Sequence, residues 1–76
     1  MAMRFKPLPP IKIIKALSKV GFSPIRQTGS HLVLGHADGR RTVVLIHGNE
    51  EIGRGLLLKI IKDTKLSKEE FLSLLE

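Results

Sequence analysis

The sequence predicts an α+β fold in the order α-β-β-β-α, with one three-stranded antiparallel sheet, helices packed on one of its faces and a short C-terminal helix. Three observations lead to it: an initial segment with helical apolar spacing, three short β-type segments, and two further helical segments. A chain of 76 residues buries only about 60% of the surface that its unfolded form exposes, so its core is one small layer. We expect residues 1–76 to form a single domain.

The first helix is expected within residues 8–22. Pro9 and Pro10 suit its start, where a missing N–H costs nothing. Its apolar residues form one stripe, made of Ile13, Ala16, Leu17 and Val20, with Ile11 and Ile14 close to it. Its basic residues form a ridge at spacings of three and four, made of Lys12, Lys15 and Lys19. Gly21 suits the left-handed conformation that ends a helix.

Three short extended segments follow, with the sequences PIRQ, HLVLGH and RRTVVLIH. In the second, alternate residues point to opposite faces, Leu32 and Leu34 to one and His31 and Val33 to the other. Asp38-Gly39, between the second and third segments, favours a tight hairpin turn. The third segment is apolar on both faces from Val43 to Ile46, which indicates a partner on the face away from the helices.

A loop over residues 47–55 leads into a second helix with the sequence LLLKIIKDTK. Its expected core stripe is Leu57, Ile60 and Ile61, joined by Leu56, whereas Leu58 is expected to be exposed or covered by another chain. The last segment, SKEEFLSLLE, opens with a capping box of Ser67 and Glu70, and its apolar face contains Phe71, Leu74 and Leu75. This element order is the layout of a double-stranded-RNA-binding domain (dsRBD).

Positive charge is concentrated in the first half of the chain. The net charge is +6; residues 1–41 contain eight Lys or Arg and one acid, and residues 42–76 contain five Lys or Arg and six acids. The basic residues of the first half are Arg4, Lys6, Lys12, Lys15, Lys19, Arg26, Arg40 and Arg41. A one-sided basic field attracts a polyanion, most commonly nucleic acid, although a solubilising surface has the same composition.

The composition also limits the cellular compartment and the kinds of metal site that we expect. The absence of cysteine excludes disulfides and thiolate metal sites. No apolar run approaches the roughly 18 residues that span a bilayer, and no apolar segment follows the basic start, so we expect a cytoplasmic protein without membrane contact.

The titratable candidates for chemistry near neutral pH are His31, His36 and His47. Their spacing gives no helix-borne pair and no neighbouring acid within the strands, so no metal or other cofactor is expected. His31 follows Gly29-Ser30, where the backbone turns sharply, and is expected on the open face of the sheet; a histidine on a wet strand edge gives the same pattern. His36 is interpreted as a surface residue, and His47 as a residue whose ring N–H steadies the following loop.

The order and spacing of several short motifs resemble the HicA family of small mRNA interferase toxins. The motifs are Gly21-Phe22, Arg26, Gly29-Ser30-His31, Asp38-Gly39, His47 and Gly55-Leu56-Leu57, and the resemblance extends from Leu8 to Leu75. The chain departs from the family pattern at Leu45, where proline is usual, and at Leu56 and Leu58, where polar residues are common.

The resemblance implies a dsRBD-like fold, metal-independent cleavage of mRNA, His31 as the catalytic residue, and neutralisation by a cognate HicB-type antitoxin, which we expect to be acidic. A histidine is well matched to proton transfer at neutral pH. We expect RNA contacts from seven further residues, Lys12, Lys15, Lys19, Arg26, Ser30, Arg40 and Arg41. The oligomeric state stays open, with a homodimer as one alternative.

Two other functions fit the charge and the fold. One is a non-catalytic RNA-binding domain, although the segment GRGLLLK offers only Arg54 and Lys59 where a dsRBD typically has a lysine-rich cluster. The other is an interaction protein that only binds an antitoxin. RNA turnover distinguishes the ribonuclease from both of these functions. The salt dependence of RNA affinity distinguishes the RNA-binding domain from the interaction protein.

Overall fold

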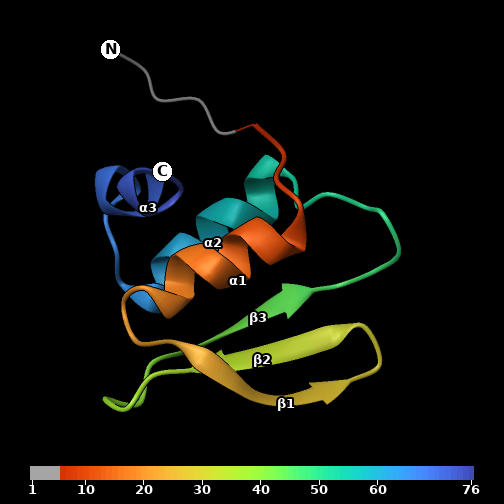
Figure 1. Ribbon diagram of the computed structural model, residues 1–76, viewed down its shortest axis with the longest axis horizontal. Coiled ribbons are helices and arrows are strands. Elements are labelled where there is room, and N and C mark those ends of the chain that lie inside the picture. The colour runs from red at the N-terminus through yellow and green to blue at the C-terminus, as the bar shows by residue number, and fades with distance from the viewer. Residues whose placement is uncertain (1–5) are drawn as a thin grey trace.

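The computed structural model describes residues 6–76 and confirms the predicted α+β fold. The elements are helix α1 (Pro10–Ser18), strands β1 (Ser23–Thr28), β2 (His31–Gly35) and β3 (Arg41–Leu45), and helices α2 (Arg54–Thr64) and α3 (Lys68–Leu74). Helices α1 and α2 lie on the same side of the sheet, an arrangement consistent with a dsRBD-like fold (Figure 1). Arg4, one of the basic residues counted above, lies outside the described residues.

The sheet is antiparallel throughout, with the strand order β1-β2-β3. Because directly paired residues point to the same face, the register groups the side chains into rows across the sheet. Two rows lie on the face away from the helices, which we call the open face: Thr28–His31–Leu45 and Arg26–Val33–Val43. The predicted hairpin turn is present, and Gly39 takes a φ of 97° there, in the region that favours glycine.

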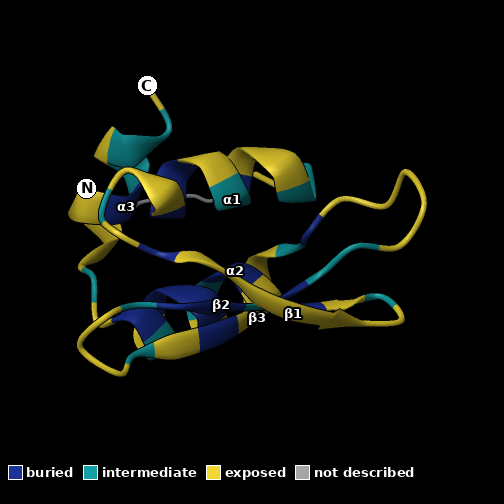
Figure 2. Ribbon diagram, turned by 60° about the horizontal axis from the view of Figure 1, so that its bottom comes forward, coloured by how far each residue is buried: buried dark blue, intermediate teal, exposed yellow. Residues whose placement is uncertain are grey.

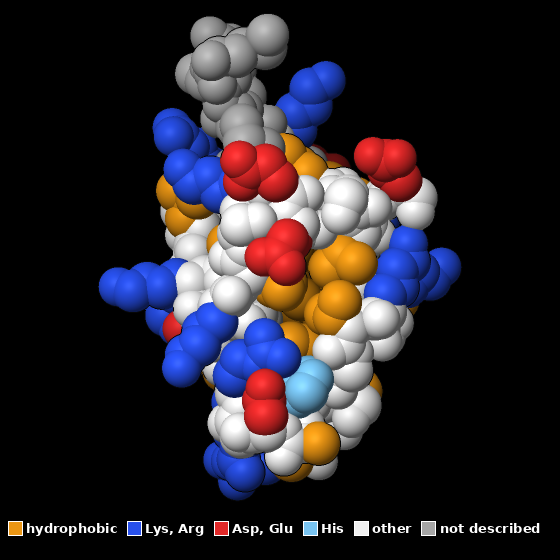
Figure 3. Space-filling view, turned by 90° about the vertical axis from the view of Figure 1, so that its left-hand side faces the viewer, with side chains coloured by type: hydrophobic (Ala, Val, Ile, Leu, Met, Phe, Trp, Pro, Cys, Tyr) orange, Lys and Arg blue, Asp and Glu red, His pale blue; other side chains and the backbone are white. Residues whose placement is uncertain are grey.

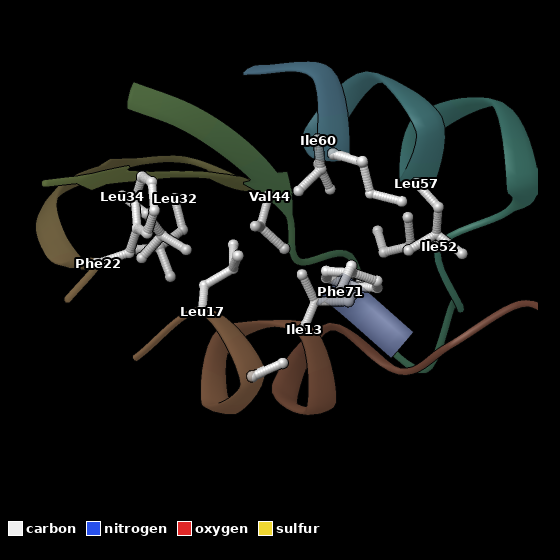
Figure 4. Packing of buried hydrophobic residues seen from close by; sticks show 12 residues of the cluster. Ile13, Leu17, Phe22, Leu32, Leu34, Val44, Ile52, Leu57, Ile60 and Phe71 are labelled. Atoms are coloured by element: carbon white, nitrogen blue, oxygen red, sulfur yellow. The ribbon is translucent and has the colours of Figure 1, made fainter. Parts of the chain in front are cut away.

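The core fills the space between α1, α2 and the inner face of the sheet (Figure 4). Leu17 of α1 points toward Val44 of β3, and Phe71 of α3 is fully buried at the centre. The buried apolar residues are Ile13, Ala16, Leu17, Phe22, Leu32, Leu34, Val44, Ile52, Leu57, Ile60, Ile61 and Phe71. All of the core-stripe residues of β2 and α2 named from periodicity are among them, except Leu56.

Local signals set the helix ends. Gly21 follows α1 with a φ of 95°, as predicted. The capping box at the start of α3 is also confirmed: the Ser67 hydroxyl accepts from the Glu70 N–H at 3.0 Å, and the Ser67 N–H donates to the Glu70 carboxylate at 2.9 Å. Such a cap contributes about 1 kcal/mol to helix stability, which matters for a helix as short as α3.

Three apolar side chains lie differently from the sequence prediction. Leu56 is 41% exposed, Leu58 packs against the core, and Ile11 is 55% exposed. The period of an α-helix places Leu56 and Leu58 on the two flanks of the stripe centred near Leu57, so the surrounding elements decide which flank is covered. Leu56, in the first turn of α2, borders a hollow at the molecular surface, and it therefore stays exposed.

Candidate active site

His31 is the first residue of β2 and is exposed on the open face. The chain reaches it through a two-residue turn in which Gly29 has a φ of 58°, a conformation that suits glycine. Its neighbours across the sheet are Thr28 and Leu45. Within residues 6–76, no hydrogen bond or ion pair joins the His31 ring to another side chain, so both ring nitrogens are available to a ligand.

A hollow of about 270 Å³ opens beside His31, between the end of the sheet and the start of α2. Its lining residues are Ser30, His31, Leu45, His47, Glu50, Glu51, Ile52 and Leu56. Two histidines and two glutamates therefore border one space, and they come from two separate parts of the sequence.

Backbone hydrogen bonds hold the loop that forms the far wall of this hollow. The Ile46 N–H donates to the Ser30 carbonyl at 2.7 Å, which ties the end of β3 to the turn before His31. Leu8 and Ile52 exchange two further backbone bonds, of 3.0 and 2.7 Å, and fix the loop to the segment before α1. The loop is thus anchored at both ends relative to His31.

Within the loop, His47 and Glu50 contact each other. His47 Nδ1 lies 3.0 Å from Glu50 Oε1, and the Glu50 N–H donates to the His47 carbonyl at 3.1 Å. Both side chains are more than 70% exposed, so the pair contributes little to stability and mainly orients the ring. The expectation that the ring of His47 steadies this loop agrees with the contact, and the His-x-x-Glu spacing was a signal in the sequence for it.

The predicted RNA-contacting arginines lie at different distances from His31. Arg26 is on the open face in the row next to that of His31. Arg41 pairs with Gly35, four residues along β2 from His31, which corresponds to about 13 Å. Ser30 lines the hollow directly. Arg26 and Ser30 are therefore close to His31, whereas Arg41 lies at the other end of the open face.

Arg40 is held by contacts within the fold. Its Nε donates to Asp38 Oδ2 at 2.8 Å, one of its Nη groups donates to the Thr64 carbonyl at the end of α2, and its guanidinium lies 5.1 Å from the centre of the Phe22 ring. The RNA contact expected from Arg40 stays a prediction, but this side chain is only 23% exposed and already has partners.

His36 belongs to the same cluster, so the interpretation of it as a mere surface residue was wrong. Its ring meets Phe22 edge-to-face at 5.1 Å, and its Nδ1 accepts from the Asp38 N–H at 3.0 Å. A side chain at Gly21 would collide with this ring. We call Phe22, His36, Asp38 and Arg40 the hairpin cluster. Figure 3 shows this end of the molecule, where histidine surface lies beside charged side chains of both signs.

Two carboxyl groups have lowered pKa values. The Arg40 backbone N–H is the main cause of the lowered pKa of Asp38, followed by the Arg40 side chain. The Ser67 backbone N–H is the main cause of the lowered pKa of Glu70, which is the carboxylate of the capping box. Both shifts come from hydrogen bonds to the charged form, and both groups lie outside the hollow beside His31.

The lysine ridge of α1 lies in the other layer of the molecule. Lys12 and Lys15 are on the exposed side of α1, which packs against the face of the sheet opposite to His31. Lys19 donates from its Nζ to the carbonyls of Leu74 and Glu76, at 2.8 and 2.9 Å. The structure thus separates this ridge from His31, and RNA bound to both surfaces would have to pass around an edge of the molecule.

The open face itself is partly apolar. Strand β1 changes register between Pro24 and Arg26, and this bulge turns Ile25 over Gly35, where a side chain would collide with it. Ile25 and Val43 are 50% and 38% exposed, and β1 is exposed along its whole length (Figure 2). The face that the sequence indicated as unusually apolar is therefore uncovered in the isolated chain.

Residues 6–76 show neither a metal-binding cluster nor a membrane-spanning helix. No group of three or more His, Asp or Glu is placed to hold a metal ion. Among the same residues, no helix has the length and apolar character needed to cross a membrane.

Comparison with known families supplies the identification. The family model described as "HicA toxin of bacterial toxin-antitoxin" matches residues 12–66, which is more than half of the chain. The chain belongs to the HicA toxin family. The match includes most of α1, the whole sheet and α2, and it covers every site residue predicted from the sequence. A search of curated proteins found no match.

Membership in the HicA family assigns the chain the toxin role in a toxin–antitoxin system and implies an antitoxin protein as its partner. The predicted family resemblance is therefore confirmed.

Proposed function

We propose that this HicA-family toxin is a metal-independent endoribonuclease that cleaves mRNA, with His31 as its catalytic residue. The observation that carries the proposal is the placement of His31: an exposed imidazole without side-chain partners among the described residues, at the end of an open sheet face and beside a hollow. Such a group is free to exchange a proton with a bound substrate.

The reaction needs little from the protein, because RNA carries its own nucleophile in the ribose 2′-hydroxyl. Once this hydroxyl loses its proton, its oxygen attacks the adjacent phosphorus. A histidine side chain is suited to accept that proton near neutral pH. A positioned acid or base typically accelerates a reaction by about 10²- to 10⁴-fold. We therefore expect a slow ribonuclease.

RNA binding to the open face supplies the other requirement, stabilisation of the phosphate charge. Arg26 is the cation nearest to the row of His31 on this face, and Arg41 extends the basic surface to its far end. The exposed apolar side chains of Ile25 and Val43 offer a surface for bases and sugars between them. Lys12, Lys15 and Lys19 are proposed to contact only RNA that continues around the molecule.

The same face is the proposed binding surface for the antitoxin, a cognate HicB-type protein. An acidic antitoxin would complement Arg26 and Arg41 while covering the apolar side chains and His31. Binding there would inhibit cleavage by excluding RNA.

The test is cleavage of a transcript by the purified toxin in the presence of EDTA. We expect products that end in a 2′,3′-cyclic phosphate and a 5′-hydroxyl. After the cut is mapped, an oligonucleotide with a 2′-deoxy nucleotide on the 5′ side of the cut should not be cleaved there. The matched control places the 2′-deoxy nucleotide one position further upstream, and it should still be cut.

Two results would contradict this function. RNA binding without any cleavage would support a non-catalytic RNA-binding domain instead. Cleavage of the 2′-deoxy oligonucleotide at the mapped bond would show that the nucleophile is not the neighbouring hydroxyl, so that the role proposed for His31 would fail.

A further inference from the structure

The geometry points to a second catalytic residue, His47, which we propose donates a proton to the 5′-oxygen that leaves when RNA is cut. This inference rests on the proposed ribonuclease function and adds a residue and a role to it. The observation behind it is that His31 and His47 line the same hollow, although they come from different parts of the sequence.

The sheet explains why the two histidines border one space. Leu45 is the direct cross-strand neighbour of His31 on the open face. His47 follows two residues later, just beyond the end of β3, and borders the same hollow as Leu45 and His31. The bond from the Ile46 N–H to the Ser30 carbonyl joins the two segments between the rings, so their separation is set by the backbone.

Cleavage of a ribose phosphodiester involves two proton transfers on opposite sides of the phosphorus. The bond from the 2′-oxygen to phosphorus forms, and the 2′-hydroxyl proton passes to the His31 imidazole. The bond from phosphorus to the 5′-oxygen breaks, and a proton from the His47 imidazolium converts that oxygen to a hydroxyl. The two histidines exchange their protonation states, and no oxidant, reductant or further reactant is required.

Glu50 is a positioning residue for His47 in this scheme. Its carboxylate lies 3.0 Å from Nδ1, which leaves Nε2 as the nitrogen free to face a ligand. The titratable side chains that line the hollow are His31, His47, Glu50 and Glu51. No hydrogen bond or ion pair joins Glu51 to His47 among residues 6–76, so Glu51 serves as the matched control.

The decisive experiment changes the leaving group. At the mapped bond, one oligonucleotide keeps the 5′-oxygen and a second carries sulfur in its place. A thiol is far more acidic than an alcohol, so a thiolate leaves without a proton donor. We expect His47→Ala and His47→Gln to cleave the oxygen-linked RNA about 100-fold or more slowly than the unaltered toxin, and the sulfur-linked RNA within about tenfold of it.

His31→Ala separates this inference from the function on which it rests. It should be slow on both oligonucleotides, because its defect is in activating the 2′-hydroxyl. Rates of His47→Ala within about threefold of the unaltered toxin on oxygen-linked RNA would overturn the inference, as would equal losses on the two linkages. Absence of cleavage by the unaltered toxin would instead overturn the proposed function, and this inference with it.

The two linkages also test the role of Glu50, whose carboxylate contacts the His47 ring. Glu50→Gln should slow cleavage of the oxygen-linked RNA more than cleavage of the sulfur-linked RNA, because only the first needs an oriented proton donor. Glu51→Gln should show a smaller difference between the two linkages. Equal losses on both linkages in Glu50→Gln would contradict the positioning role, since a residue that only stabilised the loop would affect both.

Discussion

The two ends of the sheet contain the same kinds of side chain in different states. At the hairpin end, His36 and Arg40 are about three-quarters buried and are tied to Phe22 and Asp38. At the other end, His31 is exposed and has no side-chain partner within residues 6–76. Both ends thus combine histidine with nearby arginine. Only at the hairpin end are these side chains hydrogen-bonded to other groups of the protein.

The presence or absence of partners within the fold distinguishes a structural histidine from a candidate catalytic one. The hairpin cluster joins segments that are distant in the sequence, since Arg40 reaches the carbonyl of Thr64 at the end of α2. Removing a member therefore costs stability. The rings of His31 and His47 contribute little to folding, so they are free to serve a substrate.

Among polar residues at the two ends of the sheet, Arg40→Ala should have the largest effect on stability. This change removes two side-chain hydrogen bonds of a charged group and a cation–π contact, and we expect the free energy of unfolding to fall by about 2 kcal/mol. Urea denaturation measures it, with His31→Ala as the comparison, which should lie within about 0.5 kcal/mol of the unaltered toxin. Equal losses in both variants would remove the distinction between the two ends.

A smaller effect should appear in RNA binding at the open face. Arg26→Ala should weaken binding of single-stranded RNA and reduce the slope of log affinity against log salt by about 0.7, the value for one phosphate contact. Lys62→Ala is the matched control, because it removes an exposed cation from α2 in the opposite layer. Fluorescence anisotropy over a salt series checks both. An equal change in slope for the two variants would argue against the open face as the RNA surface.

The sequence was informative wherever local signals decide the structure. Glycine at the end of α1, Asp38-Gly39 in the hairpin and the capping box of α3 each act within a few residues, and each was predicted. Alternation in β2 also placed His31 on the open face, since one side of that strand had to cover the core.

What the sequence did not reveal depends on contacts between distant segments. Helical periodicity could not decide between Leu56 and Leu58, because the hollow at the start of α2 exists only in the folded chain. The contact of His36 with Phe22, and the bulge that turns Ile25 over Gly35, also form only when separate segments come together in the fold. The approach of His47 to the hollow of His31 likewise requires the register between β2 and β3.

The assignment of catalysis to His31 is tested most directly by comparing His31 with His36, at the other end of the sheet, in one assay. Cleavage of the mapped RNA is measured under single-turnover conditions for His31→Gln and His36→Gln, with the folded fraction of each determined by circular dichroism. Per folded molecule, we expect His31→Gln to lose about 10²- to 10⁴-fold in rate and His36→Gln to stay within about threefold of the unaltered toxin. Full activity of folded His31→Gln, or an equal loss in both variants, would contradict the assignment of catalysis to His31.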